Sequence, residues 1–168
     1  MKASIRTVAG KFSTTRMVRD YTKNFYLPAM ERTRVLSANN GEQARSLHEW
    51  KRRILADWAN VKVQNVHLEG IGEAYVGKHI EVYATVELGT LSPNDVLVEG
   101  YYGGVDSHGN IDTPHVITLQ MKSAANGVFY YQGGYECIAG GVQGCTVRVL
   151  PYSPFIADKA DMGVCAWA

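Results

Sequence analysis

Hydrophobic and polar residues alternate strictly over residues 79–88. The hydrophobic set at every second position is Ile80, Val82, Ala84, Val86 and Leu88. The residues between them are Glu81, Tyr83, Thr85 and Glu87. A period of two residues predicts a β-strand with one buried face and one face toward solvent. Because such a strand cannot bury its hydrophobic face alone, the pattern also predicts a partner sheet.

Other segments after Asn60 have the composition of strands and are separated by links rich in Gly, Pro, Asn and Asp. The predicted strands cover residues 61–68, 78–88, 96–102, 115–121, 128–137, 145–150 and 163–167. About seven short strands at this spacing predict an antiparallel β-sandwich of immunoglobulin-like architecture. The Cys and Trp signature of a true immunoglobulin domain is absent from the sequence.

The first 60 residues show the period of an amphipathic helix instead. Hydrophobic residues that follow a suitable N-cap, Ser13, are Met17, Val18, Tyr21 and Phe25. Pro28 is expected to kink or end this helix, and residues 37–41 break it again. A second helix is expected to run to Asn60, and its stripe contains Ala44, Leu47, Trp50 or Lys51, Ile54 and Trp58.

These patterns predict an α+β chain with a helical segment of two main helices at residues 1–60 and a β-sandwich at residues 61–168. The helical segment has no core of its own. Its hydrophobic stripe is therefore expected to pack against further structure, against the sandwich, or in self-association.

The net charge of +1 conceals two halves of opposite sign. Residues 1–60 carry 12 Lys and Arg against 5 Asp and Glu, whereas residues 61–168 carry 5 against 11. A basic half suits either nucleic acid or an acidic protein surface. The positive charges are spread along the helical pattern, which favours the protein surface, so no nucleic-acid partner is expected. The weaker alternative is salt-sensitive nucleic-acid binding through Arg16, Arg19, Lys51, Arg52 and Arg53.

Sequence features that would indicate a membrane or an oxidising compartment are missing. The chain has no run of about 18 uncharged hydrophobic residues, and its N-terminus lacks the hydrophobic core of a signal peptide. Three cysteines, an odd number, fit reduced thiols better than a disulfide framework. We therefore expect a cytoplasmic protein without a membrane partner.

The residues alone predict no catalytic, cofactor-binding or metal-binding site. No histidine spacing suits a metal, and no Gly-rich run matches a nucleotide-binding fingerprint. Asp106, Asn110 and Asp112 resemble a weak calcium loop, but their spacing is not that of an EF-hand. Glu99 and Glu136 lie near tyrosine pairs, yet nothing in the sequence places the two carboxylates together as an acid–base pair.

Two tyrosine pairs are the candidate binding residues. Tyr101 and Tyr102 are adjacent in one predicted strand, and Tyr130 and Tyr131 are adjacent in another, so each pair sends one ring to either face of its sheet. The outward rings are suited to stack on a sugar. The alternatives are that they cover a neighbouring domain or simply line a sheet, since tyrosine is favoured in strands generally.

Several segments resemble the C-terminal region of bacterial α-glucan (glycogen or maltodextrin) phosphorylases. Phe12, Ser13, Arg16 and Tyr21 fit the pattern that starts the terminal helix of the catalytic domain in that family. The helix containing Trp50 is similar to the next segment. The β-rich part resembles the extension of one bacterial subgroup in VELGTLSPNDVLVEGYYG (residues 86–103), GCTVRVLPYSP (144–154) and VCAWA (164–168).

The resemblance implies a parent enzyme in which pyridoxal phosphate, bound to a lysine, assists phosphorolysis of α-1,4-glucan to glucose 1-phosphate. The lysine motif and the phosphate-binding residues of the family lie upstream of the matched region, so no catalytic or cofactor-binding residue carries over to this chain. Met1 is then expected to be an internal residue of the parent, or an artificial start, rather than the natural beginning. The implied role is structural: bracing the catalytic domain of the parent chain or forming homo-oligomer contacts. The alternative is a module that binds α-glucan, with Tyr101, Tyr102, Tyr130 and Tyr131 as the stacking residues.

Overall fold

The computed structural model describes residues 8, 12–73 and 75–168. The chain divides into two compact units, one ending at Glu49 and the other spanning Trp50–Ala168. The first unit is helical and the second contains all the strands described below. This composition confirms the predicted α+β class.

The helical elements are α2 (Thr14–Tyr21), the π-helical turn η1 (Thr22–Tyr26) and α3 (Leu27–Asp57). Ser13 caps α2, as predicted, because its side chain accepts a hydrogen bond from the Arg16 amide. The chain stays helical through Pro28. The π-helical turn, which ends at Tyr26, fits a proline at position 28 that offers no amide to the preceding turn.

The break predicted at residues 37–41 is confirmed. Ala38 is extended, and Asn39, Asn40 and Gly41 have φ values of 51°, 55° and 75°. The region assigned to α3 is therefore two helices separated by a tight turn. Arg45 Nη1 donates a hydrogen bond to the Asn40 carbonyl at 2.6 Å, which satisfies one carbonyl at this turn.

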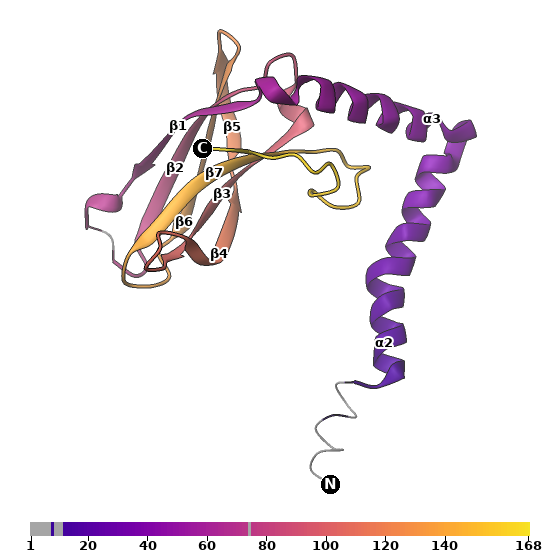
Figure 1. Ribbon diagram of the computed structural model, residues 1–168, viewed down its shortest axis with the longest axis horizontal. Coiled ribbons are helices and arrows are strands. Elements are labelled where there is room, and N and C mark those ends of the chain that lie inside the picture. The colour runs from indigo at the N-terminus through magenta and orange to yellow at the C-terminus, as the bar shows by residue number, and fades with distance from the viewer. Residues whose placement is uncertain (1–7, 9–11, 74) are drawn as a thin grey trace. The chain divides into compact units, whose positions relative to one another are not determined.

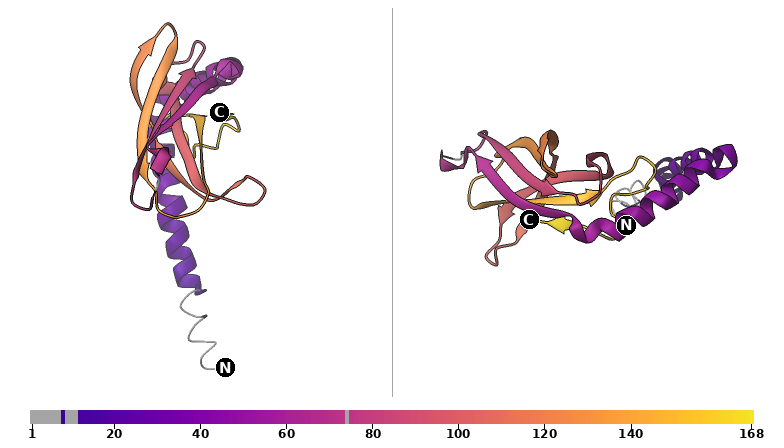
Figure 2. Two further views of the ribbon diagram at one scale, coloured as in Figure 1. Left: turned by 90° about the vertical axis from the view of Figure 1, so that its left-hand side faces the viewer. Right: turned by 90° about the horizontal axis from the view of Figure 1, so that it is seen from above.

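Two four-stranded antiparallel sheets form the second unit (Figures 1 and 2). One sheet has the order β1-β2-β6-β5, with strands Lys62–Glu69, His79–Glu87, Val128–Glu136 and Gln120–Ala125. The other has the order β4-β3-β7-β8, with strands Ile111–Thr118, Val96–Val105, Gln143–Pro151 and Ala166–Trp167. Short 3-10 turns lie at Trp58–Asn60 (η2), Ile71–Glu73 (η3) and Pro93–Asp95 (η4).

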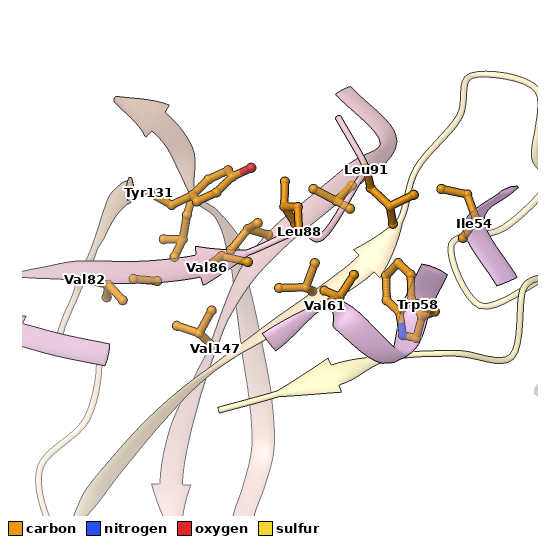
Figure 3. Packing of buried hydrophobic residues seen from close by; sticks show 14 residues of the cluster. Ile54, Trp58, Val61, Val82, Val86, Leu88, Leu91, Tyr131 and Val147 are labelled. Atoms are coloured by element: carbon orange, nitrogen blue, oxygen red, sulfur yellow. The ribbon is translucent and has the colours of Figure 1, made fainter. Parts of the chain in front are cut away.

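The alternation in β2 produces the interior of the sandwich. Its buried set matches the sequence prediction: Ile80, Val82, Ala84, Val86 and, just beyond the strand, Leu88. Val147 of β7 is also fully buried. Figure 3 shows Val82, Val86 and Val147 within one cluster of buried side chains. The two sheets therefore enclose the hydrophobic face that the sequence required them to cover.

The end of α3 contributes to the same core. Ile54 has no exposed surface, and Trp58 of η2 is 9% exposed; both belong to the buried cluster (Figure 3). Burying a side chain of this size contributes about 1.5–3 kcal/mol. The last turns of the helix are thus structural members of the sandwich unit.

The strand predicted at residues 115–121 is wrong in one respect, because the structure divides it between the two sheets. β4 ends at Thr118 and β5 begins at Gln120. Leu119 between them is 3% exposed, and its amide donates a hydrogen bond to the Val98 carbonyl at 2.9 Å. A Cβ on Gly133 would lie 2.7 Å from Leu119 Cδ2, so glycine there lets Leu119 enter the interior.

Candidate functional site

A buried carboxylate joins the end of α3 to the sandwich. Asp95, at the end of η4, is 7% exposed. Its Oδ1 accepts hydrogen bonds from Trp50 Nε1 at 2.8 Å and Arg53 Nη2 at 2.9 Å, and its Oδ2 accepts one from the Ser92 amide at 2.9 Å. Both carboxylate oxygens are therefore occupied, which is what a buried charge requires.

A second carboxylate fixes the same helix end at another point. Asp57 Oδ2 accepts hydrogen bonds from the Thr90 amide at 2.6 Å and the Thr90 hydroxyl at 2.7 Å. The side chain of Asn60 also donates to Asp57. These hydrogen bonds, led by the Thr90 hydroxyl, lower the pKa of Asp57 from its ordinary value.

A charged and aromatic cluster lies on the outer face of the sheet that contains β3 and β7. Glu99 is 3% exposed and binds two cations. Arg148 Nε and Nη2 lie 2.8 and 2.7 Å from Glu99 Oε2, and Lys159 Nζ lies 2.7 Å from Oε1. The Arg148 guanidinium also lies over the rings of Tyr101 and Trp167, 5.2 and 5.5 Å from their centroids.

This cluster ties the segment after β7 to the sheet. Lys159 belongs to that segment, and Trp167 pairs with Arg148 as part of β8. Because both oxygens of Glu99 are bound to cations, the carboxylate is suited to holding structure together rather than to transferring a proton. Glu136 lies in β6 of the other sheet, so the two carboxylates belong to different sheets and do not form a pair.

The structure distributes the four candidate tyrosines over different surfaces. Tyr131 is 5% exposed in the core, whereas its neighbour Tyr130 is exposed. Tyr102 is half-buried and stacks on Tyr135 of the opposite sheet, with ring centroids 3.8 Å apart. Tyr101 is half-buried and meets Trp167 edge to face at 5.4 Å. The four rings therefore do not form one platform, and glucan stacking by them stays a prediction.

Within residues 8, 12–73 and 75–168, no group of three or more His, Cys, Asp or Glu side chains is placed to bind a metal ion. In the loop considered for calcium, Asp106 instead accepts hydrogen bonds from the amides of His108 and Asn110, both at 2.8 Å. These bonds lower the pKa of Asp106 and close a hairpin turn. Among the helices of the described residues, none is long and apolar enough to cross a membrane.

The three cysteines are free thiols. Cys137 is buried, Cys145 is half-buried and Cys165 is exposed. Burial raises the pKa of Cys145 to about 11, so this thiol stays protonated at neutral pH.

An exposed hydrophobic stripe runs along the described part of the helical unit. Its side chains stay exposed in the structure: Met17 (52%), Val18 (54%), Tyr21 (49%), Phe25 (61%), Tyr26 (59%) and Met30 (67%). The rings of Tyr21 and Phe25 lie 5.4 Å apart, so the stripe is contiguous at that point. Exposed hydrophobic surfaces are commonly used for interactions with other protein surfaces.

Sequence reasoning missed the residues that organise these contacts. Asp95 was visible only as part of a turn, although the capping signal of Ser92 was present in the sequence. Arg148 and Trp167 were visible only as strand residues. Their shared contact with Tyr101 depends on the pairing of β3, β7 and β8, which no local pattern specifies.

A family model described as the glycogen phosphorylase C-terminal domain matches residues 58–168. The chain belongs to this family. The match covers η2 and every strand of the sandwich, including the junctions at Asp95 and Glu99. The resemblance found in the sequence motifs is thereby confirmed.

Curated relatives extend the similarity into the helical unit. The chain is 32% identical to glycogen phosphorylase from Mycobacterium bovis, over 98% of this chain and 19% of the relative. It is 31% identical to maltodextrin phosphorylase from Thermococcus litoralis, over 99% of this chain and 20% of the relative. The chain therefore spans about a fifth of the length of these relatives.

One solved structure, Pseudomonas fluorescens alkylpurine DNA glycosylase AlkC bound to DNA with an abasic site analog, aligns with 88% of this chain and 44% of its own at 17% identity. Its TM-score of 0.42 is too low to support an argument about this chain.

The pyridoxal phosphate implied for the parent enzyme has no assigned residue here. Lys159 Nζ is bound to Glu99, and Lys23, Lys62 and Lys122 are exposed. None of these four amines lies in an enclosed pocket of the kind that holds a Schiff base.

Proposed function

We propose that this chain acts as the non-catalytic C-terminal region of an α-glucan phosphorylase and braces its catalytic domain. The parent would catalyse phosphorolysis of α-1,4-glucan to glucose 1-phosphate with pyridoxal phosphate. Family membership supports this proposal, as does the match to about a fifth of the length of phosphorylase relatives. We also propose a cytoplasmic location, which suits the three free thiols.

The exposed stripe on α2, η1 and α3 is the observation that carries the bracing role. Phe25, Tyr26 and Met30 each expose more than half of their surface. A helix stabilises itself mainly by burying such a face. Basic residues accompany the stripe, so the partner surface should be hydrophobic at its centre and acidic at its rim.

Co-purification of two polypeptides tests the bracing role. The chain is produced together with the separately expressed catalytic region of its parent, and the pair is isolated through a tag on one of them. Replacing Phe25 and Met30 with Glu should weaken the association at least tenfold. Replacing Met121 with Glu, an exposed position on the sandwich, should leave it unchanged. Undiminished association of the Phe25→Glu, Met30→Glu variant would contradict the proposal.

Homo-oligomer contact is the competing use of the same stripe. Light scattering of the chain alone would then show a dimer that the double variant converts to monomers, with no effect on the catalytic region. In either case the purified chain should release no glucose 1-phosphate from maltooligosaccharides and phosphate. Measurable product would overturn the non-catalytic assignment.

We further propose that the sandwich is immunoglobulin-like and that the domain border falls near residue 60. The strand order β1-β2-β6-β5 corresponds to strands A-B-E-D of that fold, and β4-β3-β7-β8 corresponds to C′-C-F-G. The family match beginning at residue 58 supports the border. Within this scheme, residues 1–60 would continue the catalytic domain of the parent.

A second candidate function is α-glucan binding by the sandwich. Exposed aromatic side chains favour it, because Tyr130, Tyr152 and Trp167 present 42%, 45% and 48% of their surfaces to solvent. Aromatic rings with polar neighbours are suited to the mixed hydrophobic and hydroxyl surface of a sugar. Electrophoresis of the chain through gels with and without glycogen tests this function, and unchanged mobility would exclude it.

A further inference from the structure

Two sequence motifs that are far apart in the chain meet in the sandwich unit. Residues 92–95 contain the turn η4 and its N-cap Ser92, and residues 152–154 directly follow β7. The Tyr152 amide donates a hydrogen bond to the Asp95 carbonyl at 2.8 Å, which holds the two segments side by side. Both segments belong to the stretches that carry the resemblance to phosphorylases, but neither the core nor the helix junction accounts for their exposed side chains.

A groove of about 610 Å³ lies between these motifs. Its walls come from η4, the start of β3, the passage from β4 to β5, and the segment after β7. The lining includes Asn94, Gln120, Tyr131, Tyr152 and Pro154. The volume falls within the range of about 300–1,000 Å³ that is typical of sites for small molecules.

The lining favours a neutral ligand that carries hydroxyl groups. In the part of the chain that the structure describes, no charged side chain lines the groove. Phosphate or carboxylate ligands are normally bound by Arg or Lys, which the groove lacks. It offers instead the amides of Asn94 and Gln120 and the half-exposed ring of Tyr152. Amides bind hydroxyls as both donors and acceptors, and an aromatic ring packs on a hydrophobic face.

Tyr131 supplies an independent sign of a binding site. It lines the groove but is only 5% exposed, and its hydroxyl has no hydrogen-bond partner among the described residues. Burial raises the pKa of this hydroxyl to about 12, so it remains a donor at neutral pH. A buried hydroxyl without a hydrogen-bond partner is destabilising. A ligand oxygen that reached it after a small shift of the lining would recover this cost.

We propose that this groove binds a segment of α-glucan. The Tyr152 ring stacks on the hydrophobic face of one pyranose ring, and the Asn94 and Gln120 side chains bind hydroxyls of the chain. Tyr131 lies at the inner end of the site. The choice of α-glucan rests on the proposed function of the parent enzyme, whereas the neutral, hydroxyl-rich chemistry of the ligand rests on the groove itself.

Calorimetric titration of the full chain with maltoheptaose tests the proposal. Tyr152→Ala should raise the Kd at least tenfold, and Gln120→Ala should raise it about threefold or more. Tyr152→Phe keeps the ring and should stay within about twofold of the unchanged protein. The matched control is Tyr75→Ala, which removes another exposed tyrosine from a loop outside the groove and should not alter binding. Thermal unfolding of each variant shows whether it is folded.

The outcomes distinguish an α-glucan from the other ligands that the groove could bind. Absence of maltoheptaose binding, or equal losses in Tyr75→Ala and Tyr152→Ala, would overturn the proposal. Equal affinity for cellohexaose would overturn the choice of an α-linked glucan. Binding of a proline-rich peptide in place of maltoheptaose, with loss in Tyr152→Ala, would show that a protein segment occupies the groove.

The bracing role can be tested independently of the groove, because it is measured by co-purification and not by maltoheptaose binding. Loss of co-purification in the Phe25→Glu, Met30→Glu variant with maltoheptaose binding intact would confirm that two different surfaces are involved. Binding absent from every variant, with co-purification intact, would remove the groove proposal and leave the bracing role in place.

Discussion

Two buried carboxylates show how much of the sandwich unit depends on single side chains. Asp95 and Glu99 are 7% and 3% exposed, yet each has hydrogen-bond or ionic partners on both oxygens. A buried ion pair contributes little net stability compared with hydrophobic packing, but removing one partner leaves the other uncompensated. Replacing Asp95 or Glu99 should therefore lower the free energy of unfolding by more than the ion pair contributes to it.

Asp95→Ala should lower the free energy of unfolding by about 2–4 kcal/mol, because the Trp50 indole N–H and the Ser92 amide lose their acceptor. Urea unfolding followed by tryptophan fluorescence measures the change. Glu136→Ala, at an exposed position, serves as the control and should shift stability by less than about 0.5 kcal/mol. Similar values for the two variants would contradict the assigned role of Asp95.

Asp57 should make stability depend on pH in the acid range. Its pKa in the folded chain lies below the ordinary value of 3.8, so the stabilisation is fully present above that value and is lost as the pH falls through the folded-state pKa. The stability difference between the unchanged protein and Asp57→Asn should therefore shrink from pH 7 to below pH 3. Chemical denaturation at both pH values measures it, and a constant difference would show that the Asp57 charge is not involved.

Local patterns could not reveal these junctions. Trp50 and Arg53 lie 45 and 42 residues before Asp95, so the turn at residues 92–95 could be predicted from its capping residues but its contact with the helix could not. Tyr130 and Tyr131 illustrate the same limit. The sequence predicts that they face opposite sides, and only the pairing of β6 with β2 decides that Tyr131 faces the core.

A strand or helix could be predicted from the sequence where a single hydrophobic period continued along its whole length. The alternation of β2 identified its buried face residue by residue. The region around Leu119 was not predictable in the same way, because alternation continues through the point where the chain leaves one sheet for the other. The amide of Leu119 bonds to Val98 and its side chain lies against Gly133, and both contacts are distant in sequence.

The turn after β2 offers a test at the level of one element. Gly89 has a φ of +60°, and an added Cβ would lie 2.7 Å from Asp57 Oδ2. Gly89→Ala should therefore destabilise the chain both through backbone strain, about 1–3 kcal/mol, and through displacement of the Asp57 carboxylate. Gly127→Ala is the matched control, because Gly127 has a φ of +80° with open space around it. Thermal unfolding should show the larger loss at Gly89, and equal losses would mean that the carboxylate moves aside at no cost.

At the scale of the whole molecule, the compact unit begins inside the helix rather than at the first strand. Residues 50–168 should therefore fold alone with the unfolding midpoint of the sandwich in the full chain. Residues 61–168 lack Ile54 and Trp58, whose loss from a core costs about 2–5 kcal/mol each. Circular dichroism melts of the two truncated chains measure the difference. A shorter chain as stable as the longer one would show that the helix end is dispensable.

The passage through Leu119 has a mechanical meaning for the sandwich as a whole. Leu119 connects β4, at the edge of one sheet, to β5, at the edge of the other. This connecting residue is itself only 3% exposed. If the two sheets separated at this edge, Leu119 would lose its buried position between them. Separating the two sheets at the edge formed by β4 and β5 should therefore require Leu119 to leave the shared core.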